Sequence, residues 1–166
     1  GEAYTLTVSA LGLTGATSIP FTLASPADPR STVILTDTTW ASADGDINVT
    51  GPVLVSGDAT LTIEAGGEVR FDAGQTLQVN GTLVARGTAT DSVIFTSSSS
   101  SPAAGDWGHI LFANASQDAT FDAGGNYQAG SILEHCTVEY AGGASGSAYA
   151  VRIDQSGSYD FGLEHS

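Results

Sequence analysis

The chain has 166 residues, of which 18 are acidic and 4 are basic, and its net charge at pH 7 is −14. Such a charge opposes electrostatic binding to nucleic acid or to an anionic membrane. No apolar run approaches the roughly 18 residues that a membrane-spanning helix needs, and the single cysteine excludes an intramolecular disulfide. Glycine, serine, threonine and valine are abundant, whereas strong helix formers other than alanine are scarce. This composition predicts an all-β chain rich in turns.

Residues 1–25 are expected to form two strands joined by a glycine-containing turn. Apolar and polar side chains alternate from Tyr4 to Ser9, as they do in a strand with one buried face. The segment resembles the closing hairpin of a bacterial immunoglobulin-like surface domain; the alternative is a capping hairpin or an edge strand of the domain that follows. Residues 26–32 contain two prolines among small polar residues and are predicted to be a linker.

A regular pattern of short strands begins at residue 33. Pairs of apolar residues recur with one residue between them, and turn residues such as glycine and asparagine separate the pairs. The number of residues from the start of one pair to the start of the third pair after it is nearly constant. The pairs are Val53 and Val55, Leu61 and Ile63, Val69 and Phe71, Leu77 and Val79, Leu83 and Ala85, and Val93 and Phe95.

Three short strands in each repeat of roughly two dozen residues predict a parallel β-helix, in which every strand stacks on its counterpart one coil earlier. An antiparallel β-sandwich is the alternative, because it also has short strands at similar spacing, although it does not require a third-strand period. The stacks expected for the β-helix are Val53 with Leu77, Leu61 with Leu83, and Val69 with Val93.

The second half of the chain repeats more loosely. The tripeptide Leu-Glu-His at 133–135 returns at 163–165, and this wider spacing indicates one coil with a longer loop. Two further loops are expected, at residues 97–105 and 113–130. The prediction is therefore a parallel β-helix of about four to five coils over residues 33–166.

Five stretches of the sequence carry a family resemblance. They are residues 61–66, 77–83, 93–97, 107–110 and 133–142. Read in order, they resemble the opening coils of right-handed parallel β-helix proteins of bacterial cell surfaces, and the likeness covers roughly residues 45–142. Proteins of this fold include polysaccharide lyases, glycosidases, adhesins and structural stalks, so the resemblance implies an architecture and no particular activity.

The resemblance also implies what a lyase of this fold would need, namely calcium-binding carboxylates and a basic residue that removes a proton. Lysine is absent, and neither Arg86 nor Arg152 has an evident acidic cluster in its register. Asp44 and Asp46, on either side of Gly45, could hold calcium through a turn. They supply only two carboxylates and lack a longer Asp-x-Asp-x-Asp-Gly pattern, so a solvated turn is the simpler interpretation.

The return of the Leu-Glu-His tripeptide predicts stacked pairs of ionisable residues. Glu134 and Glu164 should lie about 5 Å apart on adjacent coils, where they could act as the carboxylate pair of a retaining glycosidase or simply be hydrated. His135 and His165 should stack in the same way. They are expected to form a structural ladder, because a metal site needs a third ligand and His109 lies on a different kind of strand.

Three further residue types have candidate functions. Cys136 is expected to be a small buried core residue and not a nucleophile. Trp40 and Trp107 could form a platform for stacking sugars but are expected to pack against the core. Thr60 and Thr62 could belong to an ice-binding array, which needs several ranks of threonine; the next coil should place threonine over the first and valine over the second, so only one rank continues.

These observations predict a non-catalytic structural or adhesive module of a secreted or cell-surface protein, with no catalytic, cofactor-binding or metal-binding residue and only a weak case for calcium. One alternative is a fibre subunit joined head to tail through residues 1–25 and an open C-terminal coil. Another is a fragment of a carbohydrate-active enzyme, a polysaccharide lyase or glycosidase. The expected partners are other copies of the chain or the rest of a longer surface protein, with glycans as further candidates, and neither nucleic acid nor a membrane interior.

Overall fold

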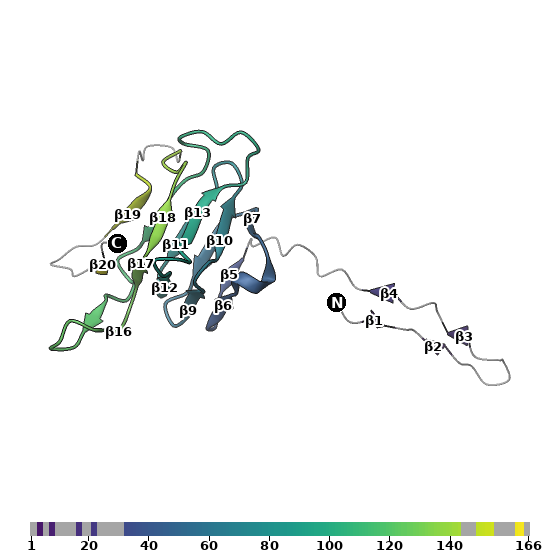
Figure 1. Ribbon diagram of the computed structural model, residues 1–166, viewed down its shortest axis with the longest axis horizontal. Coiled ribbons are helices and arrows are strands. Elements are labelled where there is room, and N and C mark those ends of the chain that lie inside the picture. Colours follow the sequence, from purple (N-terminus) through teal and green to yellow (C-terminus); the bar gives the residue numbers. More distant parts are fainter. Residues whose placement is uncertain are drawn as a thin grey trace.

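The computed structural model is built from short strands stacked in three parallel sheets, which the chain visits in turn (Figure 1). The structure describes residues 32–143 and 149–154, and the backbone of residues 3–4, 7–8, 16–17, 21–22 and 162–164. Sheet 1 contains β5 (Val33–Ile34), β8 (Val53–Val55), β11 (Leu77–Val79), β14 (Ile110–Phe112) and β19 (Val151–Ile153). Sheet 2 contains β6 (Thr38–Trp40), β9 (Thr60–Ile63), β12 (Thr82–Arg86), β17 (Ile132–Glu134) and β20 (Gly162–Glu164). Sheet 3 contains β7 (Ile47–Val49), β10 (Glu68–Phe71), β13 (Val93–Ser97) and β18 (Cys136–Val138).

The three sheets form the walls of a parallel β-helix. Every strand in them pairs in parallel with its counterpart one coil away, as in the pairing of β11 with β8 and of β12 with β9. This arrangement confirms the predicted fold and its four to five coils, and it shows that the antiparallel sandwich is wrong.

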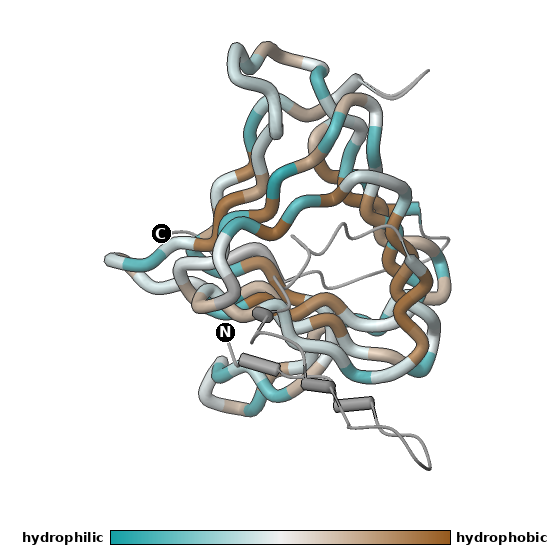
Figure 2. The backbone as a smooth tube through the Cα atoms, turned by 90° about the vertical axis from the view of Figure 1, so that its right-hand side faces the viewer, coloured by the Kyte–Doolittle hydropathy of each residue, from teal (hydrophilic) through white to brown (hydrophobic). Residues whose placement is uncertain are grey.

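The core lies inside the coils because side chains alternate between interior and exterior along each strand. In β8, Val53 and Val55 point inward and are at most 1% exposed, whereas Leu54 between them is partly exposed. Figure 2 looks along the stack and shows hydrophobic stretches of successive coils in line with one another. Each fully buried aliphatic or aromatic side chain contributes about 1.5–3 kcal/mol, so this continuous column is the main source of stability.

The predicted register is correct in two sheets and wrong in the third. Val53 pairs with Leu77, and Leu61 pairs with Leu83, as expected. Val69, however, pairs with Phe95 and not with Val93. The connection from β12 to β13 is about four residues longer than that from β9 to β10, since Leu61 stacks on Leu83 but Val69 stacks on Phe95. It contains a turn that is closed by a hydrogen bond from the amide of Thr88 to the carbonyl of Asp91.

Two insertions interrupt the later coils, close to where the sequence predicts loops. The first joins β13 to β14, so the chain leaves sheet 3 at Ser97 and re-enters sheet 1 at Ile110. The second joins β14 to β17 and contains an antiparallel hairpin of β15 (Thr120–Phe121) and β16 (Tyr127–Ala129). The sequence predicts the second insertion as a loop only, and the hairpin within it is a finding of the structure.

The N-terminal segment forms antiparallel pairs, as predicted for residues 1–25. β1 (Ala3–Tyr4) pairs with β4 (Phe21–Thr22), and β2 (Thr7–Val8) pairs with β3 (Ala16–Thr17). The assignment of this hairpin to an immunoglobulin-like domain stays a prediction, and the predicted linker falls outside the described residues up to position 31. In the part of the chain that the structure describes, no helix is long and apolar enough to cross a membrane.

Candidate functional site

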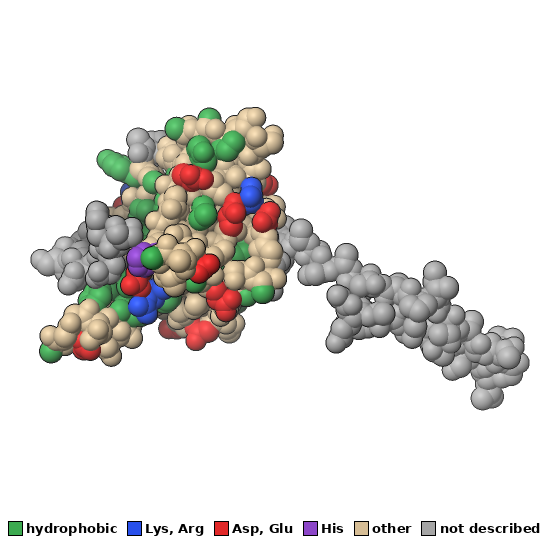
Figure 3. All heavy atoms as spheres, in the orientation of Figure 1, with side chains coloured by type: hydrophobic (Ala, Val, Ile, Leu, Met, Phe, Trp, Pro, Cys, Tyr) green, Lys and Arg blue, Asp and Glu red, His purple; other side chains and the backbone are tan. Residues whose placement is uncertain are grey.

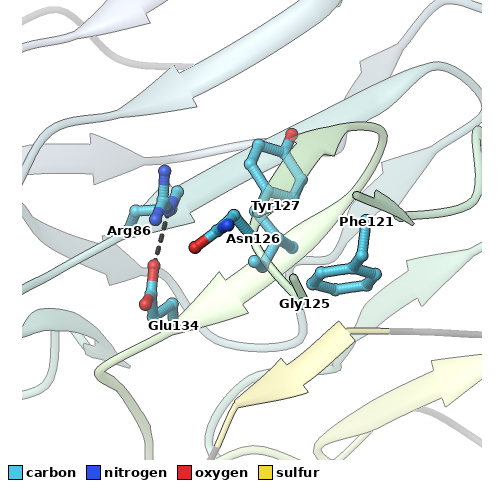
Figure 4. A pocket seen from close by; sticks show the side chains of 7 residues that line it. Arg86, Phe121, Gly125, Asn126, Tyr127 and Glu134 are labelled. Atoms are coloured by element: carbon cyan, nitrogen blue, oxygen red, sulfur yellow. Dashed lines mark hydrogen bonds and ion pairs between the residues drawn. The ribbon is translucent and has the colours of Figure 1, made fainter. Parts of the chain in front are cut away.

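The β15–β16 hairpin stands on the outer side of sheet 2 and borders a hollow of about 230 Å³. The hollow combines charged, amide and aromatic side chains from elements that are far apart in the sequence. Figure 4 shows these side chains gathered from β12, β17 and the hairpin. Its labelled lining residues are Arg86, Phe121, Gly125, Asn126, Tyr127 and Glu134.

An ion pair forms one wall of the hollow. Arg86 of β12 lies directly opposite Glu134 of β17, and the guanidinium Nε donates a hydrogen bond of 2.5 Å to the Glu134 carboxylate. Exposed pairs of this kind contribute only about 0–1 kcal/mol to stability, so the main effect of this pair is to fix two charged groups beside the hollow. The sequence analysis expects no acidic cluster in the register of Arg86, and it does not identify Glu134 as a single partner there. The coil between the two positions contains an insertion, and the shorter repeats seen in the sequence do not connect them.

Tyr127 of β16 is held from three directions. The Arg86 guanidinium carbon lies 5.1 Å from the centre of the ring, and the Phe121 ring meets it edge-on at 6.2 Å between centroids. The phenol donates a hydrogen bond of 2.6 Å to the carbonyl of Gly130. Burial raises the pKa of Tyr127, although the nearby Arg86 charge opposes the rise. The phenol is therefore protonated at neutral pH and acts as a donor.

The tip of the hairpin is closed by Asp122. One of its carboxylate oxygens accepts hydrogen bonds from the backbone amides of Gly124 and Asn126, at 2.8 and 2.9 Å. The Asn126 side chain also donates to this carboxylate, and that bond is the main reason why the pKa of Asp122 is lowered. This network fixes Asn126 at the edge of the hollow.

The base of the hairpin is anchored to β12. The amide of Gln117 donates to the carbonyl of Gly81, and the amide of Ser131 donates to the carbonyl of Gln117, both at 2.9 Å. The Ser131 hydroxyl is buried and accepts a hydrogen bond of 3.2 Å from the amide of Leu83. Gly130 has φ +91°, and a Cβ there would overlap the carbonyl oxygen of Asp118, so this position requires glycine.

Neither Tyr127 nor Phe121 is singled out by the sequence analysis. A usable signal is nevertheless present, because Gly124, Gly125 and Asn126 stand between the two aromatic residues. Glycine and asparagine are typical of hairpin turns, and aromatic residues are typical of the strands that flank them. The signal is weak because each strand of the hairpin has only two or three residues.

The two tryptophans pack in the core, as predicted. Trp40 is 1% exposed and Trp107 is fully buried, so neither offers a surface for sugar stacking. Trp107 stacks on Phe71 with 4.1 Å between ring centroids and 7° between ring planes. Its indole N–H donates a hydrogen bond of 2.7 Å to the carbonyl of Glu139, which satisfies the buried donor.

The structure describes two of the three histidines, and it places them in different parts of the coil. His135 forms the corner between β17 and β18 with φ +48°, whereas His109 is buried just before β14 in sheet 1. Burial lowers the pKa of His109, and the Arg152 charge adds to this effect. His165 lies outside the described residues, so the proposed histidine ladder stays a prediction.

The remaining ionisable candidates have different outcomes. Glu134 and Glu164 stack in the backbone register as predicted, but the Glu164 side chain is outside the described part, and a carboxylate pair stays a prediction. The Cys136 thiol is partly buried against the core, and burial raises its pKa to about 11, so it is protonated and a poor nucleophile. Asp46 lies 3.4 Å from the guanidinium of Arg70.

The interpretation of the Asp44–Asp46 turn as solvated, with only a weak case for calcium, stays a prediction, since the Asp44 side chain is not described. Among the described residues, no group of three or more histidine, cysteine or carboxylate side chains is placed to hold a metal ion. On sheet 2, Thr60 pairs with Thr82 and Thr62 with Val84, which confirms that only one threonine rank continues.

Comparison with known proteins identifies the family. No curated protein and no solved structure matches the chain. A family model for a pectate-lyase-like β-helix domain matches residues 32–161, a range that contains the coils and the hairpin described above. The chain therefore belongs to the pectate-lyase-like β-helix family.

Proposed function

We propose that this chain is a rigid, non-catalytic β-helix module that binds carbohydrate in the hollow beside the β15–β16 hairpin. The observation that carries the proposal is the pairing of Arg86 and Glu134 next to Asn126 and Tyr127. A guanidinium supplies donors and a carboxylate supplies acceptors. The Asn126 amide, whose NH2 group donates to Asp122, offers its oxygen as a further acceptor. A ligand rich in hydroxyl groups needs this mixture, together with aromatic walls that exclude water.

The scaffold supports a binding role because it holds the hollow on rigid elements. Arg86 and Glu134 stand on neighbouring strands of a five-stranded sheet, and their backbones are fixed by parallel pairing. Sites that are built on strands keep their geometry better than sites built on loops alone. The hairpin is tied to the same sheet through Gln117 and Ser131.

The chemistry of the lining residues favours binding over cleavage. An arginine side chain keeps its proton in proteins, so Arg86 is a poor general base. Glycosidases of the usual kind need two carboxylates on either side of the scissile bond, and Glu134 supplies the one carboxylate described in the wall of the hollow, where it pairs with Arg86.

A carbohydrate-active enzyme is the second candidate, and one observation favours it. The backbone positions of Glu134 and Glu164 lie opposite each other on β17 and β20, as a stacked carboxylate pair would require. Family membership is compatible with either role. In both cases we place the protein outside the cell, either alone or as part of a longer surface protein.

Head-to-tail polymerisation ranks below these candidates. The first coil already covers its own core, since Ile34, Trp40 and Ile47 are no more than 5% exposed. Another copy stacked on this end would bury few further inward-facing side chains; the exposed apolar side chains of this coil are Val33 and Leu35, which point away from the core.

Binding can be tested with a panel of oligosaccharides, using Arg86→Gln and a matched control, Arg152→Gln. Arg152 also forms an ion pair with a carboxylate, that of Asp154, and is similarly exposed, but it lies on sheet 1. We expect Arg86→Gln to weaken binding by roughly tenfold or more, because a hydrogen bond to a charged group contributes about 1.5–3 kcal/mol. The control should bind as the parent chain does.

The same panel separates binding from catalysis. After long incubation, each saccharide is analysed by mass spectrometry for shorter or unsaturated products. Binding without new products supports the proposal. Cleavage that is abolished by Glu134→Gln would replace it with the enzyme alternative, and no binding to any saccharide would refute both roles for this hollow.

A further inference from the structure

A second hollow of about 390 Å³ lies on the other side of Tyr127. Thr60 of β9, Thr82 and Val84 of β12, and Asp118 of the inserted segment form part of its wall. Tyr127 lines both hollows, so this residue stands between two adjacent hollows on the same sheet. Its ring contacts Arg86 and Phe121, and its hydroxyl donates a hydrogen bond to the carbonyl of Gly130.

The two hollows follow one another along β12. Thr82 at the start of this strand lines the second hollow, and Arg86 at its end lines the first. Four residues of a strand span ~13 Å. A ligand that contacts both hollows must therefore be an extended chain that runs along the strand direction, and a single sugar ring is too short.

The charges around the two hollows disfavour an acidic ligand. In the first hollow the charge of Arg86 is balanced by Glu134. The second hollow contains Asp118, and its described lining includes neither lysine nor arginine. On the side of the molecule drawn in Figure 3, the basic side chains in view lie beside acidic ones, and the whole chain has a net charge of −14. The charge of Asp118 in the second hollow and the net charge of the chain thus both repel anions.

The uncharged groups have the opposite effect. Thr60 and Thr82 lie directly opposite each other on β9 and β12, and both are partly exposed in the wall of the second hollow. Asn126 supplies an amide to the first hollow. Hydroxyl and amide groups donate and accept hydrogen bonds without a charge, and Val84 offers a small apolar contact between them.

We infer, on the basis of the proposed function, that the ligand is a linear saccharide chain free of acidic groups, which lies along β12 and occupies both hollows across Tyr127. Uronic acid or sulfate groups on such a chain would face Asp118 and Glu134. Neutral or amino sugars meet no such repulsion, and amino groups would be attracted.

The test uses hexamers of galacturonic acid, glucose and glucosamine, with glucose as the single-ring probe, and calorimetry at low and moderate salt. The variants are Asp118→Asn, which changes the second hollow, and Asp58→Asn, a control at an exposed turn that lines neither hollow. We expect the glucose or glucosamine hexamer to bind at least tenfold more tightly than glucose. Asp118→Asn should weaken the glucosamine hexamer several-fold, and Asp58→Asn should leave it unchanged.

The possible outcomes separate the two levels of inference. Binding of the galacturonate hexamer as tightly as the others would overturn the assignment of ligand class while leaving carbohydrate binding intact. Equal affinity for single rings and hexamers, with Asp118→Asn indistinguishable from the control, would overturn the two-hollow arrangement. If no probe binds and Arg86→Gln has no phenotype on the wider panel, the proposed function itself fails.

Discussion

Replacing Ser131 with alanine should destabilise the fold although it removes a single oxygen atom. Ser131 is 1% exposed, and its hydroxyl accepts the hydrogen bond of the Leu83 amide in β12. At the start of β11 on sheet 1, by contrast, a backbone carbonyl of the next coil is the acceptor, since the Leu77 amide donates to the carbonyl of His109. At Leu83 the next coil begins after the inserted hairpin, and the acceptor is the Ser131 hydroxyl instead of a backbone carbonyl.

The size of the effect follows from what Ser131→Ala leaves behind. The Leu83 amide would be buried without a partner, and such a donor costs about 1–3 kcal/mol. That is a large fraction of the stability of a domain, which is typically about 5–15 kcal/mol. Ser100→Ala serves as the control, because Ser100 is exposed in the loop between β13 and β14.

Urea unfolding of the two variants measures the difference, provided that the slope of the free energy with urea is unchanged. Hydrogen exchange of the Leu83 amide gives a local readout, and we expect faster exchange in Ser131→Ala only. If the two variants unfold at the same urea concentration and the amide keeps its protection, the Ser131 hydroxyl is not the partner that matters and the reasoning is wrong.

Three other predictions follow from single residues. Gly125→Ala should cost about 1–2 kcal/mol for its positive φ, whereas Gly130→Ala should cost more in thermal unfolding and displace the hairpin, because its Cβ would overlap the Asp118 carbonyl. Burial holds the pKa of His109 below its ordinary value of 6.5, so the stability that neutral His109 contributes is complete above pH 6.5 and is lost as the pH falls below that value. In His109→Gln, the free energy of unfolding should therefore depend less on pH below pH 6.5. Cys136 should react with iodoacetamide at about pH 8 at least roughly tenfold more slowly in the folded chain than in urea, because burial raises its pKa to about 11.

The fold could be predicted because inward-facing residues repeat at a nearly constant distance in the first coils. Val53, Leu77 and Ile110 occupy equivalent inward positions on sheet 1, and the first two are separated by one regular coil. The period ends where the chain leaves the sheets, after Ser97 and again after Phe112. The hydrophobic pattern does not give the length of a turn, and for this reason the sequence predicts Val93 as the partner of Val69 where the structure has Phe95, two residues later.

The candidate site could not be predicted for the same reason. Its ion pair joins Arg86 to Glu134 across a coil that contains an insertion, and spacing alone does not reveal that the two strands are neighbours. Tyr127 reaches the hollow only because a short hairpin folds back over sheet 2. Such a site depends on tertiary contacts, whereas the burial of Trp107 follows from its place next to an apolar strand.

The insertion between β14 and β17 leaves the helix from sheet 1 and returns to sheet 2, where β17 pairs in parallel with β12 from Val84 onward. Each coil contacts only its neighbours, so the segment from residue 113 to residue 131 can change in length and composition while the stack beneath it keeps its shape. Within this architecture, recognition and folding can evolve separately. The same segment is also a natural place to exchange loops by engineering, with Gly130 and Ser131 kept as the fixed end of the graft.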